Sequence, residues 1–147
     1  MPEFSASATL PCSADRLREF LGLTANLPAI SDPELELEVL SAPEIITLDG
    51  VIEFRITAYG FKQRMQHRYV EVSERQIVAV QIDGPTRSWL HRQTIQENED
   101  GTCTLVDHIE FEPPGGMLGY LMTADRITES LTDGMEFRYS SLARELG

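Results

Sequence analysis

Residues 86–112 read TRSWLHRQTIQENEDGTCTLVDHIEFE and decide the fold. At their centre, residues 98–101 (NEDG) suit a type I turn followed by a left-handed glycine, which closes a three-residue hairpin with a bulge. This turn pairs Asn98 with Thr102, and counting back along the two strands fixes which side chains share a face. The predicted pairs on one face are Trp89 with Phe111, His91 with Ile109, and Gln93 with Asp107.

Segments before this hairpin also read as strands. Residues 4–10 and 34–40 alternate apolar and polar side chains, which is the period of a half-buried strand. Asp49-Gly50 predicts a type I′ hairpin leading into a strand at 51–58, whose even-numbered side chains are apolar. The remaining strands are expected at residues 61–72, 75–83, 86–97 and 102–112.

Tight turns extend the predicted register to two more strands. A turn at 83–86 sets Val80 opposite Trp89, and a turn at Ser73-Glu74 sets His67 opposite Val80. Three strands then share one apolar face, into which several polar side chains project. Buried polar groups cost about 1–3 kcal/mol each when unpaired, so these must bond to each other, to water or to a ligand. They are His67, Tyr69, His91, Gln93 and Asp107.

Helices are expected at both ends of the strand region. Ser13 is a good N-cap for a helix over 14–21, and Gly22 suits its end. A short second helical piece is expected at 23–30. After residues 113–116 (PPGG) end the sheet, apolar spacing predicts one long amphipathic helix over 117–146. The order β-α-α-β6-α defines an α+β chain.

Length and composition restrict the function. The chain has 147 residues, of which 41% are hydrophobic and 24% charged, so we expect a single domain over residues 1–147. A net charge of −12 disfavours nucleic acid as a partner. No signal sequence and no apolar run of roughly 20 residues is present, so we expect a cytoplasmic protein without stable membrane insertion. Cys12 and Cys103 are expected as reduced thiols that approach each other if their strands pair.

Metal and cofactor sites are not predicted. The two cysteines lie in no ligand spacing, and the set His67, His91 and Asp107 comes from three strands that no spacing forces together. A serine triad built on Ser88 fails because Ser88 and His91 point to opposite faces of their strand.

Residues 84–113 contain Gly84-Pro85, Trp89, His91, Gly101-Thr102, Asp107, Phe111 and Pro113, and the last predicted helix adds Phe137-Arg138 and Leu142. In these positions the chain resembles the SRPBCC superfamily, the helix-grip proteins that include START-like lipid carriers, coenzyme Q-binding proteins and polyketide cyclases. The resemblance implies a curved antiparallel sheet of about seven strands around a long C-terminal helix, with an elongated cavity between them. Two positions depart from the pattern, since Gln93 stands where close members often carry a second histidine and Ala79 where they carry an acidic residue.

We therefore expect a START-like domain that binds or transports a small hydrophobic molecule, such as a lipid, isoprenoid or polyketide-like compound. Apolar side chains would form the cavity walls, and the inward polar groups would orient the polar end of the ligand. The expected ligand-binding residues are Met65, His67, Tyr69, Trp89, His91, Gln93, Asp107, Phe111, Ile127 and Leu131.

Two alternatives stay open at this point. His91 and Asp107 are candidates for an acid/base pair in a polyketide cyclase/dehydratase-like enzyme, because a carboxylate beside a histidine tunes its proton transfer. The other alternative is a co-chaperone-like interaction module whose interior is simply packed. The oligomeric state does not follow from the sequence.

Overall fold

The hairpin at 98–101 forms as predicted. In the computed structural model, which describes residues 1–147, strands β6 (Ser88–Glu97) and β7 (Cys103–Glu112) pair antiparallel, with Trp89 opposite Phe111 and Gln93 opposite Asp107. The backbone N–H of Asn98 donates to the Thr102 carbonyl at 3.0 Å, and Gly101 has a φ of 85°. The left-handed glycine therefore sets the register.

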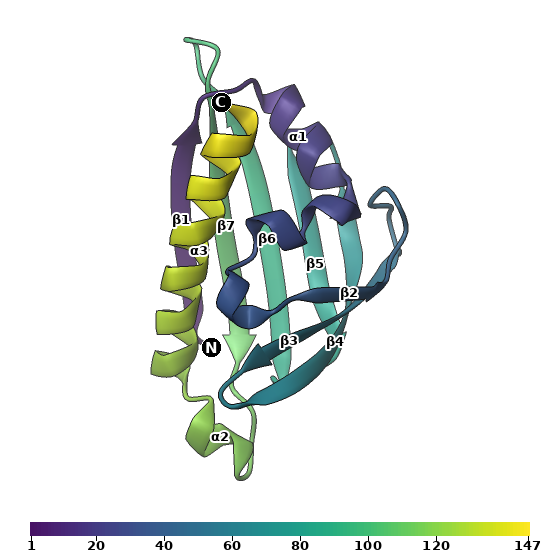
Figure 1. The fold of residues 1–147 in the computed structure, drawn as a ribbon, viewed down its shortest axis with the longest axis vertical. Helices are drawn as coiled ribbons and strands as arrows, with labels where there is room; N and C mark the ends of the chain where they lie inside the picture. Colours follow the sequence, from purple (N-terminus) through teal and green to yellow (C-terminus); the bar gives the residue numbers. More distant parts are fainter.

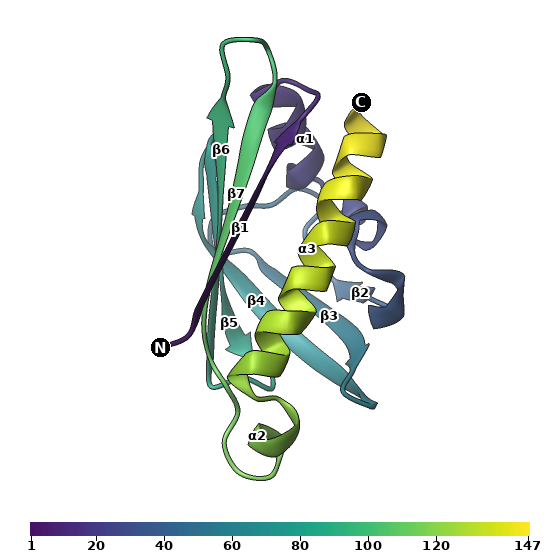
Figure 2. The same cartoon turned by 90° about the vertical axis from the view of Figure 1, so that its left-hand side faces the viewer.

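The other five strands complete one curved antiparallel sheet in the order β1-β7-β6-β5-β4-β3-β2 (Figure 1). In profile, the β2–β4 end of the sheet curves around to the far side of the C-terminal helix (Figure 2). This confirms the predicted α+β architecture, a curved sheet wrapped around a long helix. The bounds of these strands are Glu3–Leu10 (β1), Glu38–Ser41 (β2), Val51–Ala58 (β3), Phe61–Val72 (β4) and Gln76–Asp83 (β5).

Helical elements flank the sheet region in the chain. Helix α1 (Ala14–Gly22) begins at the predicted cap, where the Ser13 side chain accepts from the Arg16 N–H. The expected second helical piece forms as two 3₁₀ turns, η1 (Thr24–Asn26) and η2 (Pro28–Ile30). The C-terminal part contains α2 (Leu118–Leu121) and α3 (Ala124–Leu146). None of the helices is long and apolar enough to cross a membrane.

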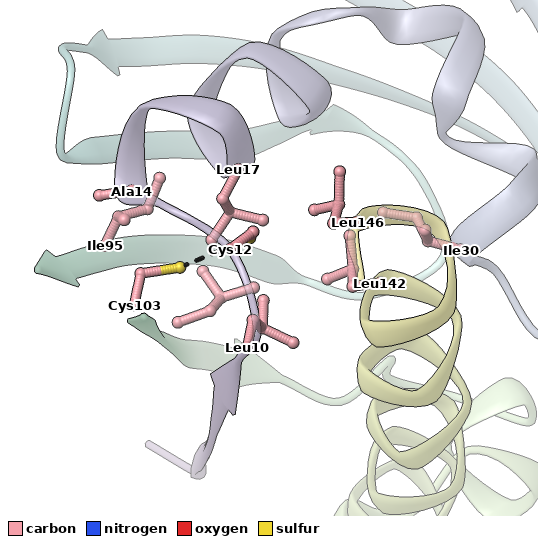
Figure 3. Close-up of a cluster of buried hydrophobic side chains, with 10 residues drawn as sticks. Leu10, Cys12, Ala14, Leu17, Ile30, Ile95, Cys103, Leu142 and Leu146 are labelled. Atoms are coloured by element: carbon pink, nitrogen blue, oxygen red, sulfur yellow. Dashed lines mark hydrogen bonds between the residues drawn. The ribbon is translucent and has the colours of Figure 1, made fainter. Parts of the chain in front are cut away.

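Two clusters of buried apolar side chains lie along α3. The first joins α1, the C-terminal end of α3 and the sheet, and includes Cys12 and Cys103, whose sulfur atoms lie 3.9 Å apart as free thiols (Figure 3). Burial raises the pKa of the Cys103 thiol to about 12. The second cluster joins the other half of α3 to β7 through Ile109 and Phe111. Between these clusters, Arg138 and Tyr139 of α3 hydrogen-bond to Gln93 and Asp107 of the sheet.

The predicted strand at 34–40 is wrong over its first half. Pro33 begins a 3₁₀ turn, η3 (Pro33–Leu35), because the Asp32 side chain caps it by accepting from the Glu34 N–H. Glu36 then adopts a left-handed φ of 49°, which breaks the extended backbone. The apolar alternation of this segment places Leu35 and Leu37 against a cavity rather than in the sheet.

The predicted type I′ hairpin at Asp49-Gly50 is also wrong. Residues 42–50 separate β2 from β3, and only Asp49 has a positive φ, of 64°. The two residues instead continue the ladder to β4, since the Asp49 N–H donates to the Tyr69 carbonyl and the Tyr69 N–H donates to the Gly50 carbonyl.

The register predicted for β5 is wrong by one residue. Ala79 lies opposite His91 and Val80 opposite Leu90, because Thr86 and Gln81 hold a wider connection through two side-chain hydrogen bonds of 2.7 and 2.9 Å. Two register shifts between β4 and β5 place His67 opposite Gln81. The inner faces of β4 and β6 are as predicted, whereas β5 turns Ile77, Ala79 and Gln81 inward in place of Val78 and Val80.

The single helix predicted over 117–146 is interrupted. Thr123 is extended and its side chain accepts from the Arg126 N–H, so it caps a new helix start. Helix α3 then continues through Gly134 without a break.

Candidate functional site

A cavity of about 250 Å³ opens between the inner face of the sheet and α3. Its walls come from the η2–η3 segment, the β3–β4 hairpin, the β5–β6 connection and one face of α3. Most of the lining is apolar, as in typical small-molecule pockets. The lining residues are Ile30, Ser31, Asp32, Leu35, Leu37, Phe54, Ile56, Ala58, Tyr59, Gln63, Met65, His67, Gln81, Pro85, Thr86, Trp89, Met122, Ile127, Ser130, Leu131, Gly134, Met135 and Arg138.

Gly134 leaves part of this space free. It lies in the middle of α3, lines the cavity, and a Cβ built at this position would meet no atom within 4 Å. Helix α3 is continuous through this glycine. Ile127, Leu131 and Arg138 face the same cavity at helical spacing.

Three buried polar atoms of the lining residues have no hydrogen-bond partner. They are Gln63 Oε1, His67 Nε2 and Arg138 Nε. The Gln63 side chain is oriented by its own amide, which donates to the Ala58 carbonyl at 3.0 Å and leaves the oxygen free. Only one further unpartnered buried side-chain atom, Ser88 Oγ, lies elsewhere. Unsatisfied polar atoms are thus concentrated at the cavity.

His67 is neutral at pH 7. Burial, and secondarily the nearby His91, lower its pKa from 6.5 to about 4. Its ring meets Phe54 edge-on, with centroids 4.9 Å apart. The imidazole therefore offers the cavity one donor or one acceptor, depending on the tautomer, and no charge.

A polar network centred on Asp107 lies next to the cavity. His91 Nε2 is 2.6 Å from Asp107 Oδ1, and the Tyr139 hydroxyl donates to Asp107 Oδ2 at 2.7 Å. Burial opposes ionisation of Asp107, but the His91 hydrogen bond and the positive charges nearby outweigh it and hold the Asp107 pKa below its ordinary value. Burial and the Asp107 charge raise the pKa of Tyr139. Tyr139 is thus a fixed donor to a buried carboxylate.

Arg138 connects the cavity to a second, smaller pocket. Its Nη2 donates to Gln93 Oε1 at 2.6 Å, and its side chain lines both spaces. The second pocket, of about 50 Å³, also exposes Tyr69 and Gln93. Burial raises the pKa of Tyr69.

The ten residues predicted to bind a ligand fall into three groups. Met65, His67, Trp89, Ile127 and Leu131 line the large cavity, and Tyr69 and Gln93 line the smaller pocket. The other three, His91, Asp107 and Phe111, line neither, because His91 and Asp107 bond to each other and Phe111 is fully buried in the apolar core.

Sequence reasoning did not place Gln63, Gly134, Arg138 or Tyr139 among the ligand-binding residues, although Arg138 stood among the positions that match the family pattern. A signal existed for Arg138, which stands at helical spacing from Leu131 and Leu142 and therefore on the inward face of α3. Tyr139 had no comparable signal, because its contact with Asp107 joins residues far apart in the chain.

The side chains that lie close enough together to bind a metal ion are not the three weighed from the sequence. His67, His91 and Asp107 do not gather as a ligand cluster. The group that does is Glu3, His108 and Glu110, on the outer face of the sheet. Ser5 and the neighbouring carboxylates already contact His108 there, so this group reads as a surface hydrogen-bond cluster.

Comparison with known proteins defines the fold. No family model and no curated protein sequence matches the chain. Among solved structures, the Zhui aromatase/cyclase from Streptomyces sp. R1128 superposes with a TM-score of 0.75 at 16% identity over 99% of this chain and 93% of that one. The ginseng major latex-like protein 151 from Panax ginseng gives 0.73 at 10% identity over 99% and 97%. A protein from Chromobacterium violaceum gives 0.75 at 16% identity over 98% and 96%.

These similarities extend over nearly the whole chain. The protein therefore has the helix-grip fold of these three proteins, a curved antiparallel sheet around a long C-terminal helix, which is the fold that the resemblance of residues 84–113 implied. At 10–16% identity the comparisons establish the fold only, so the activity has to be inferred from the geometry of the site.

Proposed function

We propose that residues 1–147 form a single domain that binds a small, largely apolar organic molecule in the cavity between the sheet and α3. The observation that carries this proposal is an apolar cavity of about 250 Å³ at which three buried polar atoms lack partners. Each such atom costs about 1–3 kcal/mol when it stays unsatisfied. A ligand that fills the space and bonds to these atoms recovers that free energy.

The same observation argues against a simply packed interaction module. A packed interior fills its space at the density of an organic crystal and pairs its polar groups. Here Gly134 leaves free space beside the cavity, and the lining residues Gln63 and His67 each have a buried polar atom without a partner.

An enzyme of the cyclase type has less support. The aromatase/cyclase comparison extends to the fold, but His91 and Asp107, the pair considered for catalysis, do not line the cavity. Both carboxylate oxygens of Asp107 are also engaged in hydrogen bonds, one with His91 and one with Tyr139. Binding without chemistry is therefore the function that the geometry favours.

Native mass spectrometry of gently purified protein tests this proposal. We expect a stoichiometric apolar adduct that is released on denaturation, and we expect the neutral dye Nile red to bind the emptied protein. Trp89 is the only tryptophan and lines the cavity, so its emission provides a second reading of binding. A protein that carries no adduct, does not bind Nile red and shows no change in Trp89 emission would have a packed interior, and the proposal would be wrong.

Substitution at Gly134 should separate cavity volume from stability. Gly134→Phe projects an aromatic ring into free space, so we expect it to weaken Nile red binding by at least about 10-fold, the effect of about 1.4 kcal/mol. Dye titration followed by Trp89 emission measures this change.

Gly134→Ala is the matched control. It should stabilise the protein by about 0.5–1 kcal/mol, because alanine replaces a mid-helix glycine, and it should leave dye affinity within about 3-fold. If both variants bind Nile red as the wild type does, the dye site is not this cavity.

A further inference from the structure

We propose that the ligand carries a carboxylate and that Arg138 is its receptor. This inference rests on the proposed function and adds the chemical class of the ligand: an apolar monocarboxylate whose charged end lies against α3 and whose apolar part fills the space toward Trp89 and Met65.

Arg138 is a buried cation with most of its donors unused. Its residue exposure is only 9%, yet a guanidinium has five N–H groups and is always charged. The structure gives it one hydrogen bond, to the neutral amide of Gln93, and leaves Nε without a partner. Arg138 forms no salt bridge with any carboxylate of the chain. Burying a charge in this way is costly unless an anion or several acceptors approach it.

The internal anion that interacts with the Arg138 charge is already engaged. Asp107 feels the positive charge of Arg138, which helps to lower its pKa, but its two oxygens accept from His91 and Tyr139. Asp107 thus balances Arg138 at a distance without satisfying its N–H groups. Apart from the bond to Gln93, the Arg138 side chain has no acceptor within the protein.

The charges of the other lining residues also favour an anionic group at Arg138. His67 is neutral, and the other charged lining residue, Asp32, uses its side chain to cap η3 by accepting from Glu34 N–H. Asp32 lies in the η2–η3 segment and Arg138 lies on α3, so the cavity wall carries one charge of each sign. An anionic head is drawn to Arg138 and away from Asp32.

A carboxylate fits the unused donors better than a hydroxyl or a ketone does. The planar guanidinium presents parallel N–H groups that match two carboxylate oxygens, and such charge-assisted bonds are about twice as strong as neutral ones. The chain as a whole carries −12 and repels anions at long range. A measured preference for an anion would therefore have to come from a local cation such as Arg138.

The test compares two probes that differ only at the head group, decanoate and decanol, both below their aggregation limits at pH 7.5. Displacement of Nile red and quenching of Trp89 emission give the two affinities. We expect the wild type to bind decanoate about 10-fold to 100-fold more tightly than decanol, which is the factor expected for charge-assisted hydrogen bonds in a buried site.

Two Arg138 variants locate the preference. Arg138→Gln should weaken decanoate binding by about 10-fold to 100-fold and change decanol binding by less than about 3-fold. Arg138→Lys keeps the charge without the planar fork and should retain part of the preference. Circular dichroism shows whether each variant is folded. If Arg138→Gln does not fold, the carboxylate assignment is tested by the ratio of decanoate to decanol affinity in the wild type and in Arg138→Lys.

The outcomes distinguish the two proposals. Equal binding of decanol and decanoate by the wild type, or a preference that survives in Arg138→Gln, would overturn the carboxylate assignment and leave an apolar binding protein. If neither probe nor Nile red binds, the proposed function fails and this inference fails with it.

Discussion

Replacing Asp107 with alanine should lower the free energy of unfolding by about 3–5 kcal/mol, because it removes a buried carboxylate and leaves its two hydrogen-bond partners unpaired. Asp107 is fully buried and joins two strands to α3 through His91 at 2.6 Å and Tyr139 at 2.7 Å. Alanine would leave the imidazole and the hydroxyl without an acceptor and would remove the internal anion that interacts with Arg138. Chemical denaturation measures the change, and thermal unfolding should show a fall in Tm on the order of 10 °C.

Two other variants control this experiment. Asp133→Ala removes an exposed carboxylate from α3 and should change stability by no more than about 0.5 kcal/mol. Asp107→Asn keeps the shape and one acceptor oxygen, so it should be less destabilising than Asp107→Ala and provides a folded variant if the alanine protein fails to fold. An Asp107→Ala protein as stable as Asp133→Ala would show that the network does not hold the helix to the sheet.

The β6–β7 hairpin shows why part of this site could be predicted. Its register depends on a local turn, and Gly101 adopts the left-handed conformation that the turn requires. Every cross-strand pair follows from that one choice, because side chains alternate with a period of two. The contact between His91 and Asp107 was therefore within reach of the sequence.

The register of β5 could not be predicted from local sequence motifs. Its register depends on a connection held open by side-chain bonds between Gln81 and Thr86 and on irregular pairing with β4. Neither feature has a turn motif that marks it. The predicted register was wrong both between β5 and β6 and between β4 and β5, and the two errors compensated each other. The inner positions of His67 and Tyr69 on β4 were therefore correctly predicted, although their neighbours on β5 were not.

The contacts of Arg138 and Tyr139 could not be predicted from the sequence, because they depend on how α3 packs against the sheet. An arginine in an amphipathic helix is usually exposed, and the sequence offers no rule that pairs Arg138 with Gln93. The same is true of the contact from Tyr139 to Asp107. Helical spacing could place Arg138 on the inward face, but only the three-dimensional arrangement shows that its charge has no carboxylate partner.

Acid should destabilise the protein by about 2–3 kcal/mol through His67 alone as the pH falls from about 6.5 to about 4. The folded protein lowers the pKa of His67 from 6.5 to about 4, first through burial and second through the nearby His91. Between these values the unfolded chain takes up a proton that the folded protein refuses, so stability falls as the pH falls. One pKa unit corresponds to about 1.4 kcal/mol, and the partial exposure of the residue reduces the full value.

Urea denaturation of the wild type and of His67→Gln at pH 7, 6, 5 and 4 measures this loss. The variant should lose about 2–3 kcal/mol less than the wild type over this range, because glutamine does not titrate. His108→Gln removes a histidine from the outer face of the sheet and should keep the His67-dependent loss. The stabilisation from Asp107, whose pKa lies below its ordinary 3.8, is lost only at still lower pH and does not overlap. Parallel stability profiles for the wild type and His67→Gln would contradict a neutral His67 at the cavity wall, whereas convergence of the two profiles toward pH 4 would place it there.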